Sequence, residues 1–325
     1  MPATRVRLIA PSGYPHDRTA MYRGVERLRE SDCVLDGLEV LERTELRYAG
    51  SDAERAADLN VLATLDALPD VALAIRGGYG ATRLLEHLHY DALRERLDGI
   101  GTVLVGHSDF TAIQMALHAK SGLVTFGGPM LGPDFGVEHL SALTLPHFWR
   151  TVCAAQGSAE WTSSGEHALD LEGPLWGGNL AMLCSLLDTP YFPRIDGGIL
   201  FVEDVSEPPF RIERLLYQLH LSGVLGRQRA LILGDFTDCR HSVYDNGYGL
   251  AEGFAQIRRV AGIPVLDGLP FGHAPDKFTL PFGVPARLRV DGGRARLDFT
   301  GYPHIGGWGN AARITCLATH HPMCG

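Results

Sequence analysis

Hydrophobic and polar positions in the first half of the chain form two alternating patterns. Short apolar runs predict strands buried on both faces, and they occur at 6–10, 38–41, 71–75, 103–105 and 123–126. Between these runs, apolar residues recur every three or four positions, as in 21–28 and from about 52 to 65, which predicts amphipathic helices. Alternating strands and helices favour an α/β fold with a mostly parallel sheet, and such sheets bind ligands beyond the carboxyl ends of their strands.

The pattern changes after about residue 150. Small and polar residues fill 151–172, which predicts a linker between an N-terminal α/β domain at 1–150 and a C-terminal domain at 173–304. The C-terminal domain is expected to be richer in sheet, with helices that end near Leu187, Gly223 and Val260 and strands at 199–202, 230–233, 278–280, 286–290 and 295–299. Residues 305–325 show little periodicity and predict an irregular tail.

A serine stands where the strand at 103–105 passes directly into a helix. Such a corner lifts a side chain clear of the sheet and leaves backbone N–H groups to receive an oxyanion, so Ser108 is a candidate nucleophile. The G-x-S-x-G motif of α/β-hydrolases is only half present, because Phe110 takes the place of the second glycine. A serine that only caps the helix is the alternative interpretation.

The strand at 71–75 runs into a glycine-rich loop, RGGYG, at 76–80. The loop has neither the G-x-G-x-x-G dinucleotide motif nor the Gly-Lys-Ser/Thr of a P-loop, which argues against a nucleotide-dependent enzyme. Two interpretations stay open for this loop. It is either a tight glycine turn or half of an oxyanion hole, in which backbone N–H groups around Gly78 face Ser108.

A serine nucleophile needs a base within hydrogen-bond reach and an acid that orients the base. Among the fourteen histidines, His273 stands out because it lies in the Gly/Pro-bounded loop LPFGHAPDKFTLPFG. His107 adjoins Ser108, but neighbours on a tight turn generally point apart. The acid has three candidates after the strand at 199–202, and spacing alone does not choose among Glu203, Asp204 and Glu207.

Composition and charge narrow the class of protein. The 325 residues suffice for two ordinary domains, and 45% hydrophobic with 21% charged residues is typical of a soluble globular protein. The net charge of -9 argues against a nucleic-acid partner, because phosphates require a basic face. No apolar run is long enough for a membrane span or a secretion signal. The six cysteines are scattered without a C-x-x-C pair, so we expect a cytoplasmic protein with free thiols and no metal site.

Eight stretches of the chain, in order and content, resemble the LD-carboxypeptidase family of serine peptidases, which includes the muramoyltetrapeptide carboxypeptidases. They are IAPSGY, LAIRGGYGATRLL, GHSDFTAIQ, TFGGPML, LWGGNLAMLCSLLDTPYFP, GILFVEDVSEPPFRIERLL, LILGDF and LPFGHAPDKFTLPFG. The resemblance runs from about residue 6 to 301, and eight motifs in the right order are far more specific than any one of them. The tail after Pro303 departs from the usual ending of the family and is assigned no role.

The resemblance implies a role for each candidate residue. It makes Ser108 the nucleophile, Glu203 the acid and His273 the base, with an oxyanion hole formed by the backbone N–H groups of Gly78 and Asp109. The implied fold is a flavodoxin-like or glutamine-amidotransferase-like domain followed by a mixed-sheet domain, with the triad assembled at their interface. The implied activity is removal of the terminal D-alanine from murein tetrapeptides, at an L,D bond, in peptidoglycan recycling. Metal and cofactor are not required, and a homodimer is expected.

A carboxypeptidase must also bind a free carboxylate, which an arginine does best. Arg76, before the glycine loop, and Arg211, after the acid strand, are the candidates, although either is equally suited to pair with a local carboxylate. Trp176 and Asn179 are candidates for the wall of the substrate cleft. Trp176 is equally suited to a buried position at the domain seam.

One alternative lies within the same family, and another belongs to a different class of protein. Some family members resemble microcin C self-immunity proteins, which cut an amide or phosphoramidate in an aminoacyl nucleotide and share the triad. An aromatic platform for adenine would distinguish their pocket from one shaped for a D-amino acid. A non-catalytic α/β binding module is the other alternative, and the presence of Ser, Glu and His at all three matching positions argues against it.

Overall fold

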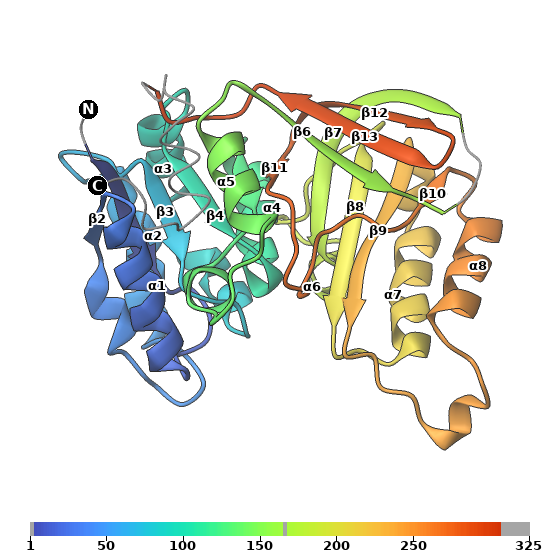
Figure 1. Ribbon diagram of the computed structural model, residues 1–325, viewed down its shortest axis with the longest axis horizontal. Coiled ribbons are helices and arrows are strands. Elements are labelled where there is room, and N and C mark those ends of the chain that lie inside the picture. Colours follow the sequence, from blue (N-terminus) through green and yellow to red (C-terminus); the bar gives the residue numbers. More distant parts are fainter. Residues whose placement is uncertain (1–2, 165–167, 307–325) are drawn as a thin grey trace.

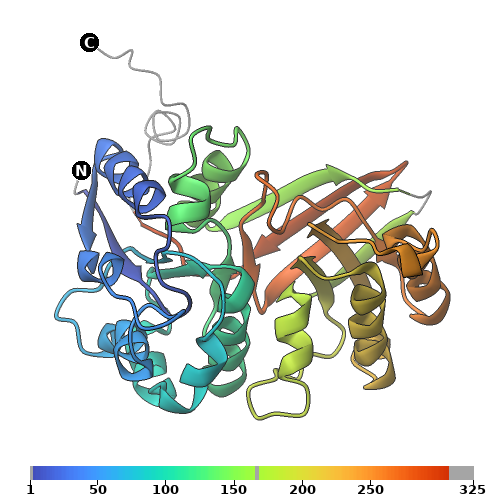
Figure 2. The same ribbon diagram turned by 90° about the horizontal axis from the view of Figure 1, so that it is seen from below.

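The computed structural model describes residues 3–164 and 168–306, so the tail predicted at 305–325 lies almost wholly outside the described residues. Two sheets with flanking helices make up the described part of the chain (Figures 1 and 2). None of its helices is long and apolar enough to cross a bilayer.

The first sheet has the strand order β11-β5-β4-β3-β1-β2. Its strands are β1 (Thr4–Ile9), β2 (Cys33–Asp36), β3 (Val71–Ala74), β4 (Val103–Gly106), β5 (Thr125–Gly127) and β11 (Leu280–Phe282). Strands β1 to β5 are parallel, and β11 joins antiparallel to β5. The order β2-β1-β3-β4-β5 is that of a flavodoxin-like sheet, as predicted.

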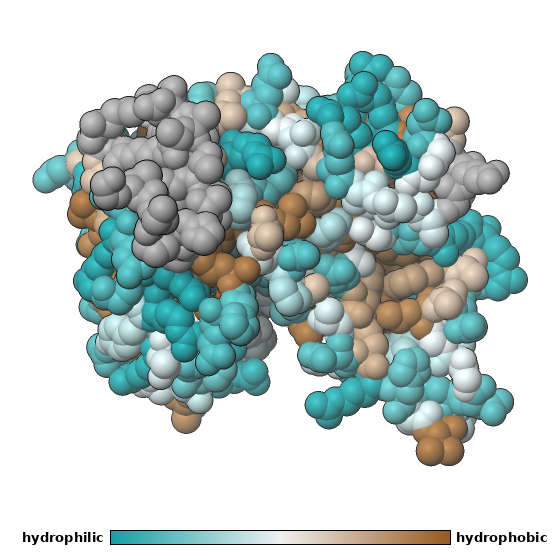
Figure 3. Space-filling model, in the orientation of Figure 1, coloured by the Kyte–Doolittle hydropathy of each residue, from teal (hydrophilic) through white to brown (hydrophobic). Residues whose placement is uncertain are grey.

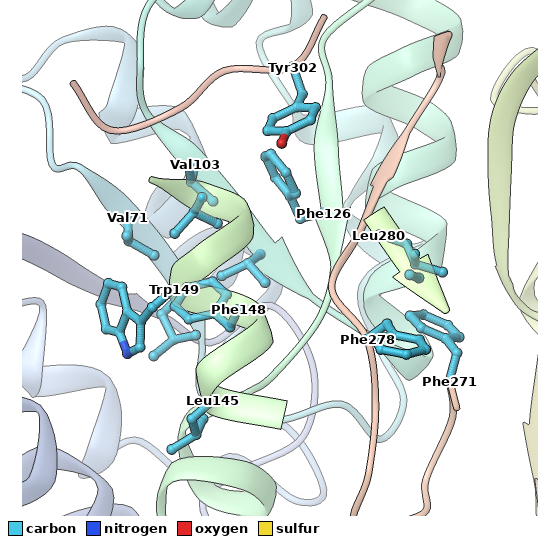
Figure 4. Packing of buried hydrophobic residues seen from close by; sticks show 14 of the residues in the cluster. Val71, Val103, Phe126, Leu145, Phe148, Trp149, Phe271, Phe278, Leu280 and Tyr302 are labelled. Carbon is cyan, nitrogen blue, oxygen red and sulfur yellow. The ribbon is translucent and has the colours of Figure 1, made fainter. Parts of the chain in front are cut away.

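Helices cover both faces of the first sheet because its central strands are apolar on both sides. Val71 and Leu73 of β3 belong to one apolar cluster, and Ala72 and Ala74 belong to the other. The first cluster includes residues of α1 (Arg18–Glu30) and α5 (Thr144–Val152), and the second includes residues of α2 (Asp52–Asn60), α3 (Tyr90–Leu97) and α4 (Thr111–Ser121). Figure 4 shows Trp149 of α5 beside Val71.

The prediction of a strand at 38–41 is wrong. Strand β2 lies earlier, at Cys33–Asp36, and Leu38–Leu41 form a 3-10 turn. The strand signal is weak because β2 is an edge strand whose Val34 is exposed. Gly37, at φ +76°, then turns the chain, so that the apolar run which follows packs as a turn.

The second sheet has the order β10-β9-β8-β7-β12-β13-β6. Its strands are β6 (Gln156–Thr162), β7 (Leu169–Asn179), β8 (Ile199–Val205), β9 (Ala230–Thr237), β10 (Val265–Leu266), β12 (Val284–Asp291) and β13 (Arg294–Thr300). Strands β7 to β10 are parallel, and the rest are antiparallel, which confirms the predicted mixed sheet. Helices α6 (Leu180–Ser185), α7 (Pro209–Leu221) and α8 (Leu250–Val260) lie on one side of it (Figures 1 and 2).

The segment predicted to be a linker, 151–172, contains strand instead. It holds all of β6 and the first residues of β7. Strand β6 is the outer strand of the second sheet, and of its seven residues only Ala159 and Trp161 are buried. An edge strand with one buried face needs few apolar residues, which is why its composition resembles a linker.

One segment of the chain returns from the second sheet to the first. After β10, residues 267–283 cross the seam, and β11 pairs with β5 before Gly283 leads the chain back into β12. Phe271, Phe278 and Leu280 anchor this crossing segment in the apolar cluster that reaches both sheets (Figure 4). The loop that carries His273 is therefore held between the two sheets.

Candidate active site

Ser108 occupies a strained corner between β4 and α4. Its φ of +64° lies in the left-handed region, which costs a non-glycine residue about 1–2 kcal/mol. Residues Ser108–Phe110 form a 3-10 turn that continues directly into α4. The corner holds the Ser108 hydroxyl at the carboxyl end of β4, where the sequence predicts it.

The glycine loop packs tightly against this corner. A Cβ at Gly77 would lie 2.8 Å from Ser108 Cβ and 3.0 Å from its Oγ, so only glycine fits there without displacement. The Asp109 carboxylate secures the loop, because its Oδ2 accepts a hydrogen bond of 2.9 Å from the Ala81 backbone N–H. Burial raises the pKa of Asp109, against the effect of its hydrogen bonds. Gly77 thus packs against Ser108, and Gly78 lines the same cavity as Ser108. The N–H groups of Gly78 and Asp109 as an oxyanion hole stay a prediction.

The structure brings the three predicted triad residues together from three parts of the fold. Ser108 Oγ lies 3.0 Å from His273 Nε2, and His273 Nδ1 lies 2.8 Å from Glu203 Oε2. Ser108 follows β4 in the first sheet, Glu203 lies on β8 in the second, and His273 lies on the crossing segment. The site is therefore assembled at the seam, as predicted from the resemblance. Both distances suit hydrogen bonds in which Ser108 donates to the imidazole and the imidazole donates to Glu203.

Glu203 has a partner on each of its carboxylate oxygens. Asn179, at the end of the neighbouring strand β7, donates its Nδ2 to Glu203 Oε1 at 3.2 Å and to Asp204 Oδ1 at 3.1 Å. Asp204 turns away from the imidazole, and its Oδ2 accepts from the Ala181 N–H at the start of α6. Burial and the adjacent Glu203 raise the pKa of Asp204 to about 6. Of the three acids that spacing left open, Glu203 alone contacts His273.

A β-bulge places a third carboxyl group near Glu203. Val202 pairs with Leu233 and Asp204 with Phe236, so Gly234 and Asp235 of β9 stand opposite Glu203 alone. Burial, and then Glu203, raise the pKa of Asp235 to about 6. The backbone N–H of Asp235 donates to Phe271 O at 2.8 Å, two residues before His273. The bulge thus ties β9 to the segment that carries His273.

A cavity of about 620 Å³ opens beside Ser108 and His273. Its walls come from the start of α1, the glycine loop and the stretch at 130–138. Arg76 lines this cavity, and its role in binding a carboxylate stays a prediction. Its guanidinium donates to Tyr14 O and Gly77 O, each at 3.1 Å, and burial lowers its pKa. Sequence reasoning missed the other titratable residues in the wall, because nothing in their local pattern marks them: His16, Asp17, Arg23 and Glu138.

Three predicted substrate-binding residues lie elsewhere. Trp176 is fully buried, and its Nε1 donates to Gln228 Oε1 at 2.9 Å, so it is a core aromatic at the seam. Arg211 pairs with Glu207 at 2.7 Å on α7 and does not line the cavity. Asn179 is buried behind Glu203 and orients that carboxylate. Trp176 and Asn179 point into the protein, whereas the Arg211 side chain is 47% exposed on α7, away from the cavity.

His107 lies beside His273, although the sequence analysis gave it no role. Its extended backbone turns the side chain away from Ser108, as expected, but the ring comes to lie against His273 with centroids 4.5 Å apart. His107 is buried, and burial lowers its pKa well below the usual value, so the ring is neutral. Only the folding of the crossing segment over this corner brings the two rings together, and no local signal reveals it.

Comparison with known proteins places the chain in a family. Residues 6–128 match the family model for the LD-carboxypeptidase N-terminal domain, and residues 172–288 match that for the C-terminal domain. A murein tetrapeptide carboxypeptidase of Pseudomonas aeruginosa is 32% identical over 269 residues, which cover 78% of this chain and 83% of the relative.

Solved structures are similar over nearly the whole chain. A muramoyltetrapeptide carboxypeptidase from Oxalobacter formigenes has 43% identity and a TM-score of 0.85, covering 92% of this chain and all of its own. The microcin C7 self-immunity protein of Escherichia coli in complex with aspartyl sulfamoyl adenosine has 26% identity and a TM-score of 0.82, covering 94% of this chain and 98% of its own. Both domain models and the extent of these similarities show that the chain belongs to the LD-carboxypeptidase family.

Proposed function

We propose that this protein is a serine carboxypeptidase that removes the terminal D-alanine from murein tetrapeptides in peptidoglycan recycling. The observation that carries the proposal is the hydrogen-bonded series Ser108–His273–Glu203 at the wall of a 620 Å³ cavity. Similarity to proteins named as murein tetrapeptide and muramoyltetrapeptide carboxypeptidases supports the choice of substrate.

The geometry supports an acyl-transfer mechanism. His273 Nε2 takes the proton of Ser108 as Oγ attacks the carbonyl before the terminal residue, and Glu203 holds the imidazole in the tautomer that has Nδ1 protonated. The backbone N–H groups of Gly78 and Asp109 stabilise the tetrahedral oxyanion, each by about 3 kcal/mol in the transition state. His273 then protonates the leaving D-alanine amine, and water attacks the acyl-enzyme by the same route in reverse.

Arg76 is the proposed partner of the substrate carboxylate. It lines the cavity that contains Ser108, and its described hydrogen bonds go to two backbone carbonyls and to His16. No carboxylate pairs with it among the described residues, so its charge is available to a ligand. Arg211 lacks this freedom because it already pairs with Glu207.

The aminoacyl-nucleotide alternative has weaker support from the cavity. No Phe, Tyr or Trp occurs among the described residues that line it, and an adenine-binding pocket would favour such a platform. His16 is the ring nearest to that role, and it is engaged by Arg76 and packs edge-on against Tyr14.

Incubation of the purified protein with the two substrate classes tests the proposal. We expect mass spectrometry to detect D-alanine release from a murein tetrapeptide and no cleavage of aspartyl sulfamoyl adenosine. The matched tripeptide, which lacks the terminal D-alanine, is the control. Cleavage of the nucleotide analogue without D-alanine release would establish the alternative instead.

The expected cytoplasmic location and homodimer belong to the same proposal. Cys153, Cys184 and Cys239 carry free thiols, which suits a reducing compartment. The loop between β9 and α8 projects from the molecule and ends in a hydrophobic tip (Figures 1 and 3), where Val243 and Tyr244 are almost fully exposed. An apolar tip of this kind favours burial against a second copy. Light scattering after size exclusion should give twice the chain mass, and Tyr244→Ser should shift it toward the monomer.

A further inference from the structure

Three potential metal ligands converge beside the nucleophile. One donor atom from each of His107, Glu203 and His273 lies within 4.8 Å of the donor atoms of the other two. Across residues 3–164 and 168–306 no other group of three side chains does so. Two imidazoles and a carboxylate form a donor set that suits Zn²⁺.

His107 has no part in the proposed reaction, yet it is the member of the group whose ring nitrogens make no well-formed hydrogen bond with a described residue and are therefore available to a metal ion. Its side chain is 2% exposed, and neither ring nitrogen makes a hydrogen bond of normal geometry, although the Gly272 backbone lies beside the ring. Burying an imidazole without a partner is unfavourable, because it loses the hydrogen bonds that water provides. A neutral ring in this state has a lone pair that a cation would satisfy.

A second cavity gives an ion a route to His107. It has a volume of about 430 Å³, and both His107 and His273 line it. Its wall also carries Glu138 and the buried ion pair of Lys277 with Asp134, so two carboxylates face one lysine there and the balance of charge favours a cation. His273 lines the Ser108 cavity as well, so the two cavities adjoin at this residue, and His107 lines only the second.

We propose that Zn²⁺ binds His107, Glu203 and His273 and thereby inhibits the enzyme. The binding stands on the geometry alone, and the inhibition rests on the proposed function. Ligand atoms of a tetrahedral Zn²⁺ stand about 3.4 Å apart, so the group must contract around the ion. Neither ring nitrogen of His107 has to give up a well-formed hydrogen bond for this contraction.

Coordination through either nitrogen of His273 stops the reaction. If Nδ1 binds the ion, the single ring proton moves to Nε2, which then has no lone pair to accept the Ser108 proton. If Nε2 binds the ion, the lone pair that acts as the base is occupied. No covalent bond of the protein or the peptide changes in either case, so removal of the ion restores activity. The metal is an inhibitor here and takes no part in the hydrolysis.

Metal binding is tested first in a protein without activity. Ser108→Ala protein is titrated with Co²⁺, whose visible absorption reports a four-coordinate nitrogen and oxygen site, and Zn²⁺ is then added to displace it. We expect the same affinity in a variant that also carries His139→Gln, because His139 lines the same cavity outside the group. We expect His107→Gln, and His107→Asn as a second variant, to weaken binding 10- to 100-fold, with melting temperatures checking the fold. Unchanged binding in both folded His107 variants, or no absorption band in the parent, overturns the proposed site.

Inhibition is tested separately with an active enzyme. We expect Zn²⁺ to inhibit D-alanine release by the parent and by His139→Gln, and a chelator to restore it. His107→Gln should require at least tenfold more Zn²⁺ for half inhibition. If the parent releases no D-alanine, the proposed function fails, while the Co²⁺ titration still decides the metal site. Full activity in the presence of bound Zn²⁺ overturns the inhibitory role.

Discussion

Glu203 is the residue on which the charge arrangement of the site depends. It is fully buried, and both its oxygens are engaged, one by His273 and the other by Asn179. The neighbouring carboxyl groups of Asp204 and Asp235 have pKa values raised to about 6, in part by Glu203 itself. A carboxylate so enclosed is an orienting group for the imidazole, because His273 bonds only to it on the Nδ1 side.

Replacing Glu203 by Gln should therefore disturb the tautomer of His273 while leaving the fold of the site intact. The amide has nearly the same shape, but it favours the wrong imidazole tautomer, so we expect kcat for D-alanine release to fall by about 10³- to 10⁴-fold with little change in KM. Steady-state assays of the tetrapeptide measure both constants. Gln at Glu207, which pairs with Arg211 away from His273, is the matched control and should change kcat less than twofold. A Glu203→Gln enzyme within tenfold of the parent would remove Glu203 from the triad.

Asp235 should make stability depend on pH. Its pKa is about 6 in the folded protein and about 3.8 when unfolded, so the folded protein favours the neutral carboxyl. The contribution of Asp235 to the free energy of unfolding is therefore complete below pH 3.8 and is lost as the pH rises through 6. Asp235→Asn keeps the neutral form at every pH. We expect it to raise the melting temperature by roughly 2 °C at pH 8, on the order of 1 kcal/mol after allowance for partial exposure, and by less at pH 5. Asp98→Asn, on the surface, should show no such difference between the two pH values.

At the scale of elements, the glycine loop and the corner at Ser108 form one unit. Gly77→Ala adds a methyl group 2.8 Å from Ser108 Cβ, so either the loop or the corner must shift. We expect kcat to fall at least 100-fold, since an ångström of displacement at a reacting group has about this effect. Gly226→Ala is the control, because a Cβ there meets nothing within 4 Å. Equal activities of the two variants would show that the contact between the loop and Ser108 is not needed.

The elements that the sequence predicted best are those whose pattern reflects burial on both sides. Strands β3 and β4 have no exposed face, and their apolar runs mark them clearly. Strand β2 was predicted at the wrong residues, and β6 was predicted to be part of a linker. Each is an edge strand, which pairs with one neighbouring strand and buries one face, so burial leaves little trace in its composition. Trp176 was ambiguous for a different reason, since an aromatic residue suits both a cleft and a core, and only the packing of β7 shows that it is buried.

At the scale of the whole molecule, the crossing segment makes the site depend on both sheets. Lys277 on this segment pairs with Asp134, and both side chains are almost completely buried. Lys277→Met leaves the Asp134 charge buried without its partner, so we expect the free energy of unfolding to fall by about 3–5 kcal/mol. Urea denaturation measures the loss. Arg18→Met breaks an exposed pair with Glu42 and should lose less than about 1 kcal/mol. Equal losses in the two variants would contradict this account of the seam.

Contacts across the seam were also the least predictable part of the site. The triad was identified by the resemblance of eight motifs, whereas local spacing left Glu203, Asp204 and Glu207 equivalent. His107 acquires its position only when the two sheets meet, and Asn179 only when β7 pairs with β8, because their partners lie 166 and 24 residues away along the chain. Local pattern therefore predicts strands and corners, and tertiary packing decides which side chains face one another.

The most direct test of the central claim is the rate of D-alanine release by Ser108→Ala protein, measured against the parent at equal melting temperature. An enzyme that acylates Ser108 should lose at least 10³-fold in kcat, because no other group in the site replaces the attacking hydroxyl. A Ser108→Ala rate within tenfold of an active parent would contradict the account. Hydrolysis would then proceed without acylation of the residue at this corner.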